Sequence, residues 1–286
     1  MFPVKSSRFF LIILFVFSAV AAHAAPPRRI ISLAPSVTKD LYLLGAGDKV
    51  VAVTVYCPPE ARKTKEGIGT VQEPNIEKIV SLSPDLVIAS REGNREETVA
   101  TLRKLGISVF VMGSYNNFAD ICNGFHELGK LIGKEEAAQK IITESRNRID
   151  NVYKTIRGKK PVTVFWEVGA QPLFTVNKNT FVNEFMERAG GINIFGDLPV
   201  RYPQISREEV VSRDPDVIML VTMGDVTTRE TRSWGKFTGM KAVKSGRIYV
   251  LSDSIFTDPT PVALAEGIEK VAALLYAPQT AIKTSK

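Results

Sequence analysis

Short runs of β-branched and other apolar residues alternate with amphipathic segments along most of the chain. One series of such runs lies between residues 29 and 112, and a second follows Pro161. Buried strands that alternate with helical patterns are typical of a mostly parallel α/β sheet. The expected strands are 30–33, 50–55, 86–89 and 109–112 in the first series, and 162–166, 173–176, 217–221 and 248–251 in the second. The pattern therefore predicts two similar α/β lobes.

A single long amphipathic segment separates the two series. Residues 135–157 contain no Gly or Pro, and their apolar residues recur at helical spacing, with Gly158 as a stop signal and Pro161 just beyond. A helix of this length reaches roughly 35 Å, about the width of a small domain. We expect it to brace both lobes, and such a stiff connection disfavours a wide hinge closure.

The N-terminus has the three parts of a secretory signal peptide. Lys5 and Arg8 precede a stretch, 9–22, that is apolar apart from Ser18 and leads into the small-x-small sequence Ala22-His23-Ala24. A stretch of fourteen residues is too short to span a bilayer core, which needs about 20. We expect residues 1–24 to be removed on export, and the rest to divide into an N-terminal lobe (25–133), an inter-lobe helix (134–158) and a C-terminal lobe (159–286).

A gapless internal repeat relates the two halves. Residues 75–88 align with 206–219, with Glu, Val-Ser and Pro-Asp matching before an apolar strand. Each copy begins with a good N-cap residue, Asn75 or Ser206, so Glu77 and Glu208 are both the second residue after a cap. Each glutamate could simply complement its helix dipole. Alternatively, the pair could bind matching cations on a two-fold symmetric partner.

Composition and motifs argue against several classes of function. The formal net charge of +7 is mild and dispersed, without the Lys/Arg runs of nucleic-acid-binding proteins. The chain has no nucleophile motif, no glycine-rich phosphate loop and no paired-histidine motif, so we predict neither an enzyme nor a resident cofactor. His126 is the one histidine after the signal, too few for a zinc or manganese site. Cys57 and Cys122 could form a disulfide or remain two small buried thiols.

Five segments in order resemble the periplasmic binding proteins for vitamin B12 and ferric chelates, and most closely the B12-binding branch. The likeness covers nearly the whole chain after the signal. The segments are ISLAPS (31–36), PNIEKI (74–79), SPDLVI (83–88), AGGINIF (189–195) and YPQISRE (202–208).

The resemblance implies a fold, a role and a partner. The fold is two α/β lobes joined by one long helix, with the ligand cleft between them. The role is that of a monomeric periplasmic protein that captures cobalamin or a related corrinoid for an ABC importer. In that family one glutamate on each lobe docks onto arginines of the inner-membrane permease, which works with its ATPase. Glu77 and Glu208 match those positions.

The resemblance also implies a set of aromatic ligand contacts. The matching positions are Tyr56, Phe174, Tyr202 and Trp234. Aromatic faces suit a large, flat, partly apolar solute, and hydroxyl and indole N–H groups can orient it. Each ring could equally be ordinary core packing. Trp166 lies inside an expected strand and is assigned to the core.

The chain departs from the family pattern at several positions. Val71 and Ser90 stand where near relatives have tryptophans, and Lys39 replaces an acid of the first helix. The basic residue often found near the C-terminal Pro-rich turn is absent from residues 258–261. These departures leave a ferric siderophore or haem open as the solute. A periplasmic ligand sensor or adaptor is a further alternative.

Overall fold

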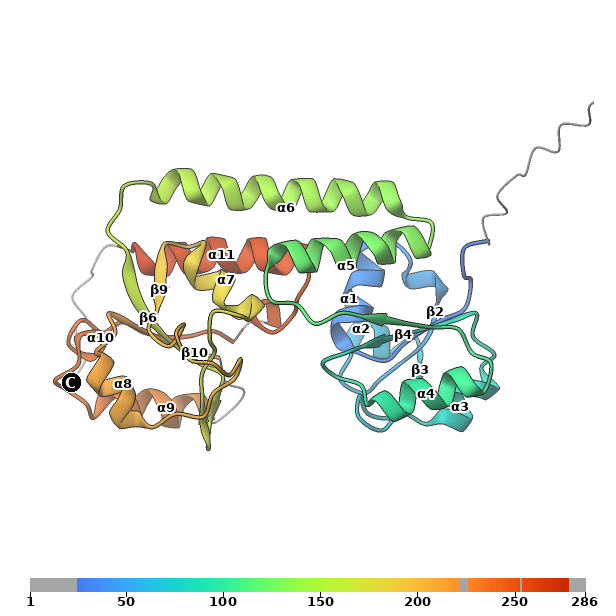
Figure 1. The fold of residues 1–286 in the computed structure, drawn as a ribbon, viewed down its shortest axis with the longest axis horizontal. Helices are drawn as coiled ribbons and strands as arrows, with labels where there is room; N and C mark the ends of the chain where they lie inside the picture. The colour runs from blue at the N-terminus through green and yellow to red at the C-terminus, as the bar shows by residue number, and fades with distance from the viewer. Residues whose placement is uncertain (1–24, 222–225, 253, 278–286) are drawn as a thin grey trace, which may run out of the picture.

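The computed structural model describes residues 25–221, 226–252 and 254–277 as two α/β lobes (Figure 1). The strand order is β3-β2-β1-β4-β5 in the sheet of the N lobe and β11-β10-β6-β9 in the sheet of the C lobe. Every pairing in these two sheets is parallel. The predicted fold class is confirmed. The predicted signal segment, 1–24, lies outside the described residues.

The N lobe runs from the first strand to the helix before the inter-lobe connection. Its elements are β1 (Ile30–Ser32), α1 (Pro35–Leu43), η1 (Gly47–Lys49), β2 (Val50–Val53), α2 (Pro59–Arg62), β3 (Glu66–Gly67), α3 (Ile76–Ser81), β4 (Leu86–Ser90), α4 (Glu96–Lys104), β5 (Val109–Met112) and α5 (Phe118–Leu131).

The C lobe follows the inter-lobe helix. Its elements are β6 (Val162–Glu167), β7 (Gly169–Ala170), β8 (Leu173–Phe174), α7 (Phe181–Glu187), β9 (Gly191–Asn193), α8 (Arg207–Arg213), β10 (Val217–Leu220), α9 (Val226–Gly235), α10 (Lys241–Lys244), β11 (Ile248–Val250), η2 (Ser254–Phe256) and α11 (Pro261–Leu275).

The predicted strand at 173–176 does not join the main sheet. Only Leu173–Phe174 is a strand, paired antiparallel with β7. The next backbone amides turn away from the sheet, because Thr175 N donates to Pro203 O (3.1 Å) and Asn177 N to Arg201 O (2.9 Å). The place beside β6 is instead taken by β9, a short strand that the hydrophobic pattern did not indicate.

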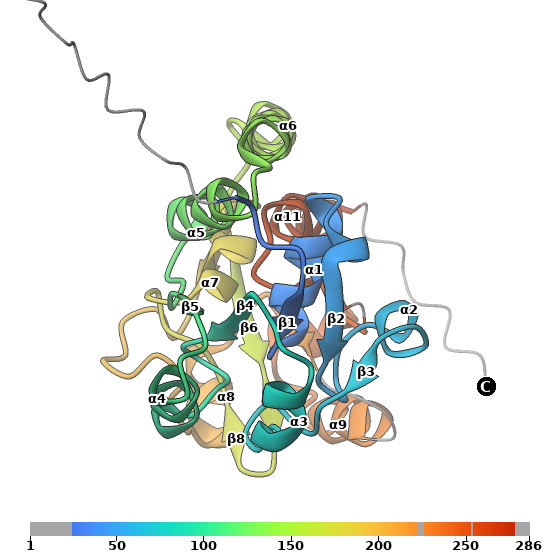
Figure 2. The same cartoon turned by 90° about the vertical axis from the view of Figure 1, so that its right-hand side faces the viewer.

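The long helix α6 (Glu135–Ile156) lies outside the other helices and spans both lobes, packing on α5 and α11 (Figure 1). Its buried residues follow helical spacing: Ala138, Ile142, Ser145, Ile149 and Val152. Gly158 has a φ of +80°, which glycine adopts without strain, and the chain turns there into β6. Figure 2 looks along α6 and shows it on the outer face of the layer formed by α5 and α11.

One hydrophobic core is shared by both lobes. It runs through the helix layer and includes Leu41, Phe125, Ile149 and Leu264. Each lobe has a second core on the other face of its sheet, around Ile79 in the N lobe and Phe165 in the C lobe. Close-packed interiors resist deformation, so a shared core agrees with the expected stiff connection between the lobes.

The two copies of the internal repeat also form equivalent hydrogen bonds. The Asn75 side chain accepts from Lys78 N, and the Ser206 side chain accepts from Glu209 N. The matching aspartates also act alike: Asp85 accepts from Arg29 N at the start of β1 (2.9 Å), and Asp216 accepts from Thr163 N in β6 (3.0 Å). Each copy of the repeat is therefore a helix–strand unit whose aspartate hydrogen-bonds to the backbone at the start of the neighbouring parallel strand.

Cys57 and Cys122 are both buried and unpaired, which agrees with the second of the two interpretations. Thr38 Oγ1 donates to Cys57 Sγ at 3.1 Å. Among the residues that the structure describes, no helix is both long and apolar enough to cross a membrane.

Candidate functional site

A cavity of about 570 Å³ lies between the lobes, and we call it the inter-lobe cavity. Strands of both lobes end at it: Glu92 follows β4, Val168 follows β6 and Val221 follows β10. Crevices at the carboxyl ends of strands are the usual ligand sites of open α/β sheets. Its lining residues are Glu92, Val168, Gly169, Ala170, Phe181, Val182, Tyr202, Val221, Phe256 and Thr257.

The lining is mostly apolar, with few polar groups. Phe181, Phe256 and Tyr202 contribute rings, and the Val, Gly and Ala residues add flat aliphatic or backbone surface. The polar side chains are the carboxylate of Glu92 and the hydroxyls of Tyr202 and Thr257. Such a surface suits a broad, flat, partly apolar solute that a few hydrogen bonds orient.

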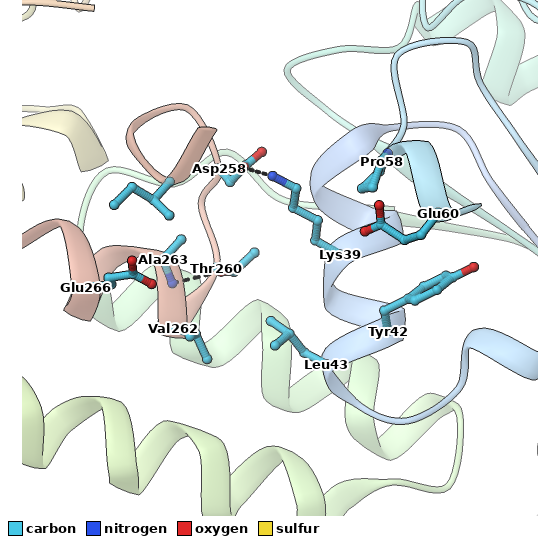
Figure 3. Close-up of a pocket in the computed structure, with 11 residues that line it drawn as sticks. Lys39, Tyr42, Leu43, Pro58, Glu60, Asp258, Thr260, Val262, Ala263 and Glu266 are labelled. Carbon is cyan, nitrogen blue, oxygen red and sulfur yellow. Dashed lines mark hydrogen bonds and ion pairs between the residues drawn. The ribbon is translucent and has the colours of Figure 1, made fainter. Parts of the chain in front are cut away.

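A second cavity, of about 360 Å³, lies between α1 of the N lobe and the start of α11, and we call it the side cavity (Figure 3). Tyr42, Leu43 and Val262 form its apolar part, and Glu60 and Glu266 add carboxylates. The segment 254–258 stands between the two cavities. Ile255 and Asp258 line the side cavity, whereas Phe256 and Thr257 line the inter-lobe cavity.

Two of the departures from the family pattern meet at the side cavity. Lys39 Nζ from α1 forms an ion pair with the carboxylate of Asp258, and the two side chains point toward each other in Figure 3. Lys39 Nζ also donates to Ser254 Oγ (2.9 Å). Burial raises the pKa of Asp258, although the Lys39 ammonium opposes this. The lysine on the first helix and the acidic Pro-rich turn thus form one contact between the lobes.

Tyr202 is the predicted aromatic that the structure places in the inter-lobe cavity. Its side chain is 39% exposed, and the guanidinium of Arg201 lies 5.6 Å from the centre of its ring. Partial burial, with the Glu92 carboxylate nearby, raises the pKa of its hydroxyl. The hydroxyl therefore stays protonated and can donate to a bound solute.

The other two predicted aromatics at strand ends lie outside the cavity lining. Tyr56 is 67% exposed and lines neither cavity. Phe174 is half-buried in β8, where its carbonyl accepts from Val168 N (3.0 Å). Phe174 therefore supports the cavity through the backbone of a lining residue.

Trp234 does not face the cleft, which corrects the prediction that its ring contacts the solute. The ring has no exposed surface and packs edge-to-face on Phe165, with centroids 5.4 Å apart. Its Nε1–H donates to Glu167 Oε2 at 2.7 Å, and the guanidinium of Arg207 lies over the ring at 4.4 Å. Trp166 is fully buried, as expected.

A buried polar network therefore stands behind the cavity in the C lobe. Glu167 ends β6 immediately before the lining residue Val168, and burial raises the pKa of its carboxyl to about 7 despite the Trp234 hydrogen bond. Glu230 is 1% exposed and forms an ion pair with Arg207 at the start of α8. The network joins the end of a cavity strand to the helix that carries Glu208.

Glu77 and Glu208 are both exposed and both occupy the second position of their helices, α3 and α8. Figures 1 and 2 show α3 and α8 on the side of the molecule away from α6, one on each lobe. The two carboxylates are therefore carried by equivalent helices on the same side of the molecule.

Most residues of the cavity lining were not predicted from the sequence. Val168–Ala170 directly follow the expected strand 162–166, so the rule that ligands bind at carboxyl strand ends could have found them. Phe181, Val182 and Phe256 had no such signal, because their apolar side chains do not differ in type from core residues. Within the described residues, no group of three or more His, Cys, Asp or Glu could hold a metal ion.

The chain matches the family model described as periplasmic binding protein over residues 30–255. It is 32% identical to the vitamin B12-binding protein of Vibrio cholerae serotype O1 over 264 residues, which cover 92% of this chain and 94% of that protein. It is 35% identical to the vitamin B12-binding protein of Photorhabdus laumondii over 211 residues, covering 73% of this chain and 76% of that protein.

Solved structures give the same result for the fold. The crystal structure of the periplasmic vitamin B12 binding protein BtuF of Vibrio cholerae matches with a TM-score of 0.76 and 32% identity, covering 88% of this chain and 98% of that one. The periplasmic heme-binding protein RhuT from Roseiflexus sp. RS-1 matches with a TM-score of 0.78 and 23% identity, covering 88% and 99%. The second likeness shows the fold alone.

Proposed function

Because this chain belongs to the periplasmic binding protein family, we propose that it captures cobalamin or a related corrinoid and delivers it to an ABC importer. The observation that carries the proposal is the apolar inter-lobe cavity at the carboxyl ends of the strands. The similarity to vitamin B12-binding proteins along most of the chain supports it. Capture is a binding event that shifts populations of the protein and involves no chemical step.

The charge of the cavity favours a corrinoid over the alternatives. Among the described residues that line it, Glu92 is the charged one, and it is already paired with Arg201 (2.8 Å). A corrinoid presents a flat ring with amide side chains, which can hydrogen-bond to the Tyr202 and Thr257 hydroxyls. Haem carboxylates or an anionic ferric siderophore would instead require unpaired cations, because buried charges need partners.

Delivery is assigned to the two repeated helices. Glu77 and Glu208 are exposed, occupy the same helical position and are carried on the same side of the molecule. We assign these two carboxylates to cations of a permease in the inner membrane. Export to the periplasm is assigned to residues 1–24, which match a signal peptide.

The proposal is tested by calorimetric titration of residues 25–286 with cyanocobalamin, cobinamide, haem and a ferric siderophore. We expect cyanocobalamin to bind at least tenfold more tightly than haem or the siderophore. Cobinamide lacks the lower nucleotide, so its affinity shows whether the protein recognises the ring or the nucleotide. Tighter binding of haem or the siderophore would overturn the corrinoid assignment, and binding of none would overturn the function.

A cavity-filling variant locates the site. Thr257→Trp places a large ring at an exposed lining position and should abolish binding. Thr143→Trp is the matched control, because Thr143 is an exposed threonine on α6, away from the cavity. Unchanged affinity in Thr257→Trp would place the solute elsewhere.

A further inference from the structure

Among the residues that the structure describes, two ion pairs join the N lobe to the C lobe, and they differ in their surroundings. Lys39 of α1 pairs with Asp258, and Arg201 of the C lobe pairs with Glu92, which follows β4. In the first pair the side chains are 27% and 8% exposed, and in the second 32% and 31%. The Lys39 pair therefore has a buried acid, whereas both members of the Arg201 pair remain in contact with water.

Arg201 forms more than one bond across the lobes. Its Nη1 lies 2.8 Å from Glu92 Oε1, and its Nη2 donates to the carbonyl of Tyr115 at 3.0 Å, both in the N lobe. Its Nε donates to the carbonyl of Asn179 in its own lobe at 2.9 Å. One planar guanidinium thus links a C-lobe loop to two separate N-lobe segments.

Both of these contacts adjoin the inter-lobe cavity. Glu92 and Tyr202 line it on the Arg201 side, and Phe256 and Thr257 line it next to Asp258. Each of the two ion pairs is therefore a bridge between the lobes beside the cavity. The Arg201 bridge is the easier of the two to break, because exposed ion pairs are weak and screened by salt, whereas breaking a buried one leaves an uncompensated charge.

We propose that the Arg201–Glu92 ion pair is the gate of the inter-lobe cavity and that the Lys39–Asp258 pair is the fixed contact about which the lobes open. The proposal rests on the proposed function, in that the solute is large enough to require opening. The shared hydrophobic core limits the opening to a small motion. Arg201 is then a positioning residue: it holds the lobes in register and holds Tyr202 at the cavity edge.

The chain offers a closely matched control for Arg201. Arg213 pairs with Asp197 at 2.9 Å, is 34% exposed, donates to the carbonyl of Ile194 and lies over an aromatic ring, that of Phe195. Every one of these contacts lies within the C lobe. Arg213→Ala therefore removes an arginine with the same kinds of contact without unlinking the lobes.

The first test measures cyanocobalamin release by stopped-flow. Arg201→Ala and Glu92→Ala should each speed dissociation at least fivefold, and the double variant should be no faster than the faster single one. In the unaltered protein, added salt should speed release, and Arg201→Ala should remove most of that salt dependence. Arg213→Ala should leave the rate and its salt dependence unchanged. Equal rates in Arg201→Ala and Arg213→Ala would overturn the gate.

The second test needs no solute, and so separates the gate from the proposed function. Spin labels at Lys104→Cys on α4 and Lys244→Cys on α10, both exposed, report the distance between the lobes, with Cys57 and Cys122 replaced by alanine. Arg201→Ala should broaden the pulsed-resonance distance distribution, and Arg213→Ala should not. An unchanged distribution in Arg201→Ala would refute the gate. A broadened one in a protein that binds no corrinoid would leave the gate standing and refute the solute assignment.

Discussion

The two lobes repeat one helix–strand unit but use it against different surroundings. In both, a capped helix presents a glutamate at its second position and leads into a strand. The aspartate just before that strand accepts a hydrogen bond from the backbone at the start of the neighbouring parallel strand. Behind α3 the unit packs on apolar residues, with Ile76 at the position that Arg207 occupies in α8. Behind α8, Arg207 reaches the buried Glu230 and the Trp234 ring.

The cavity is divided even more unequally. Among its lining residues, Glu92 is the one that comes from the N lobe. The comparison indicates that the surface assigned to the transporter is symmetric, whereas the surface assigned to the solute belongs mainly to the C lobe. Four tests address this difference between the two lobes, and the first should have the largest effect.

Charge reversal of both repeated glutamates tests the symmetry of the docking surface. Glu77→Lys with Glu208→Lys should lower cellular uptake of cobalamin at least tenfold, because like charges would face each other at the permease. Cobalamin affinity should not change, since neither residue lines the cavity. Glu136→Lys is the control: it is an exposed glutamate at the second position of α6, on the other side of the molecule. Normal uptake by the double variant would contradict the assignment.

Glu167→Gln tests the buried polar network behind α8, which stands where the N lobe has apolar residues behind α3. A carboxyl whose pKa is about 7 when folded and near 4.5 when unfolded binds its proton more tightly in the folded state. Its contribution to stability is full below pH 4.5 and is lost as the pH rises to about 7. The loss is on the order of 3 kcal/mol.

The measurement is the free energy of unfolding in urea at several pH values between 4.5 and 7.5. The unaltered protein should lose stability over this window relative to Glu167→Gln, in which the amide oxygen can still accept from Trp234 Nε1. If the free energy of unfolding changed with pH in the same way in both proteins, the pKa of Glu167 would not be raised by folding, and the account of the network would be wrong.

Tyr202→Ala tests the unequal division of the cavity. Removal of a ring that lines the cavity should weaken cyanocobalamin binding by ~1 kcal/mol or more, about a fivefold rise in Kd. Tyr56→Ala should have a smaller effect, because that ring is outside both cavity linings. Tyr153→Ala, at an exposed tyrosine of α6, is the control. A larger loss for Tyr56→Ala than for Tyr202→Ala would reverse the assignment of the two rings.

Removal of the two helix caps should have the smallest effects. Asn75→Ala and Ser206→Ala should each lower the free energy of unfolding by about 1 kcal/mol. Ser206→Ala should cost more, because Ser206 belongs to a capping box in which Glu209 bonds back to its backbone. Urea unfolding gives both values. A larger loss for Asn75→Ala would mean that the reciprocal Glu209 contact adds nothing.

Local patterns were sufficient to predict much of this molecule from its sequence. The spacing of apolar residues predicted α6 to within a residue of its end at Ile156, and the gapless repeat placed Glu77 and Glu208 at equivalent helical positions. Both signals arise within one helical turn or one short segment. They do not depend on which distant segments meet.

The cavity could not be predicted in the same way. Its lining comes from six separate stretches, near residues 92, 169, 181, 202, 221 and 256, and only the sheet topology brings them together. Residue type was also a poor guide, since Trp234 belongs to the core although a tryptophan suits a ligand face. The gate pair is separated by 109 positions and leaves no local signal.

The most direct test of the account is a crystal structure of residues 25–286 grown with cyanocobalamin. We expect the corrin ring in the inter-lobe cavity, in contact with Tyr202, Phe181 and Phe256, with the Arg201–Glu92 ion pair formed at its edge. A ring bound in the side cavity beside Tyr42 and Val262, or on the outer surface of either lobe, would contradict it.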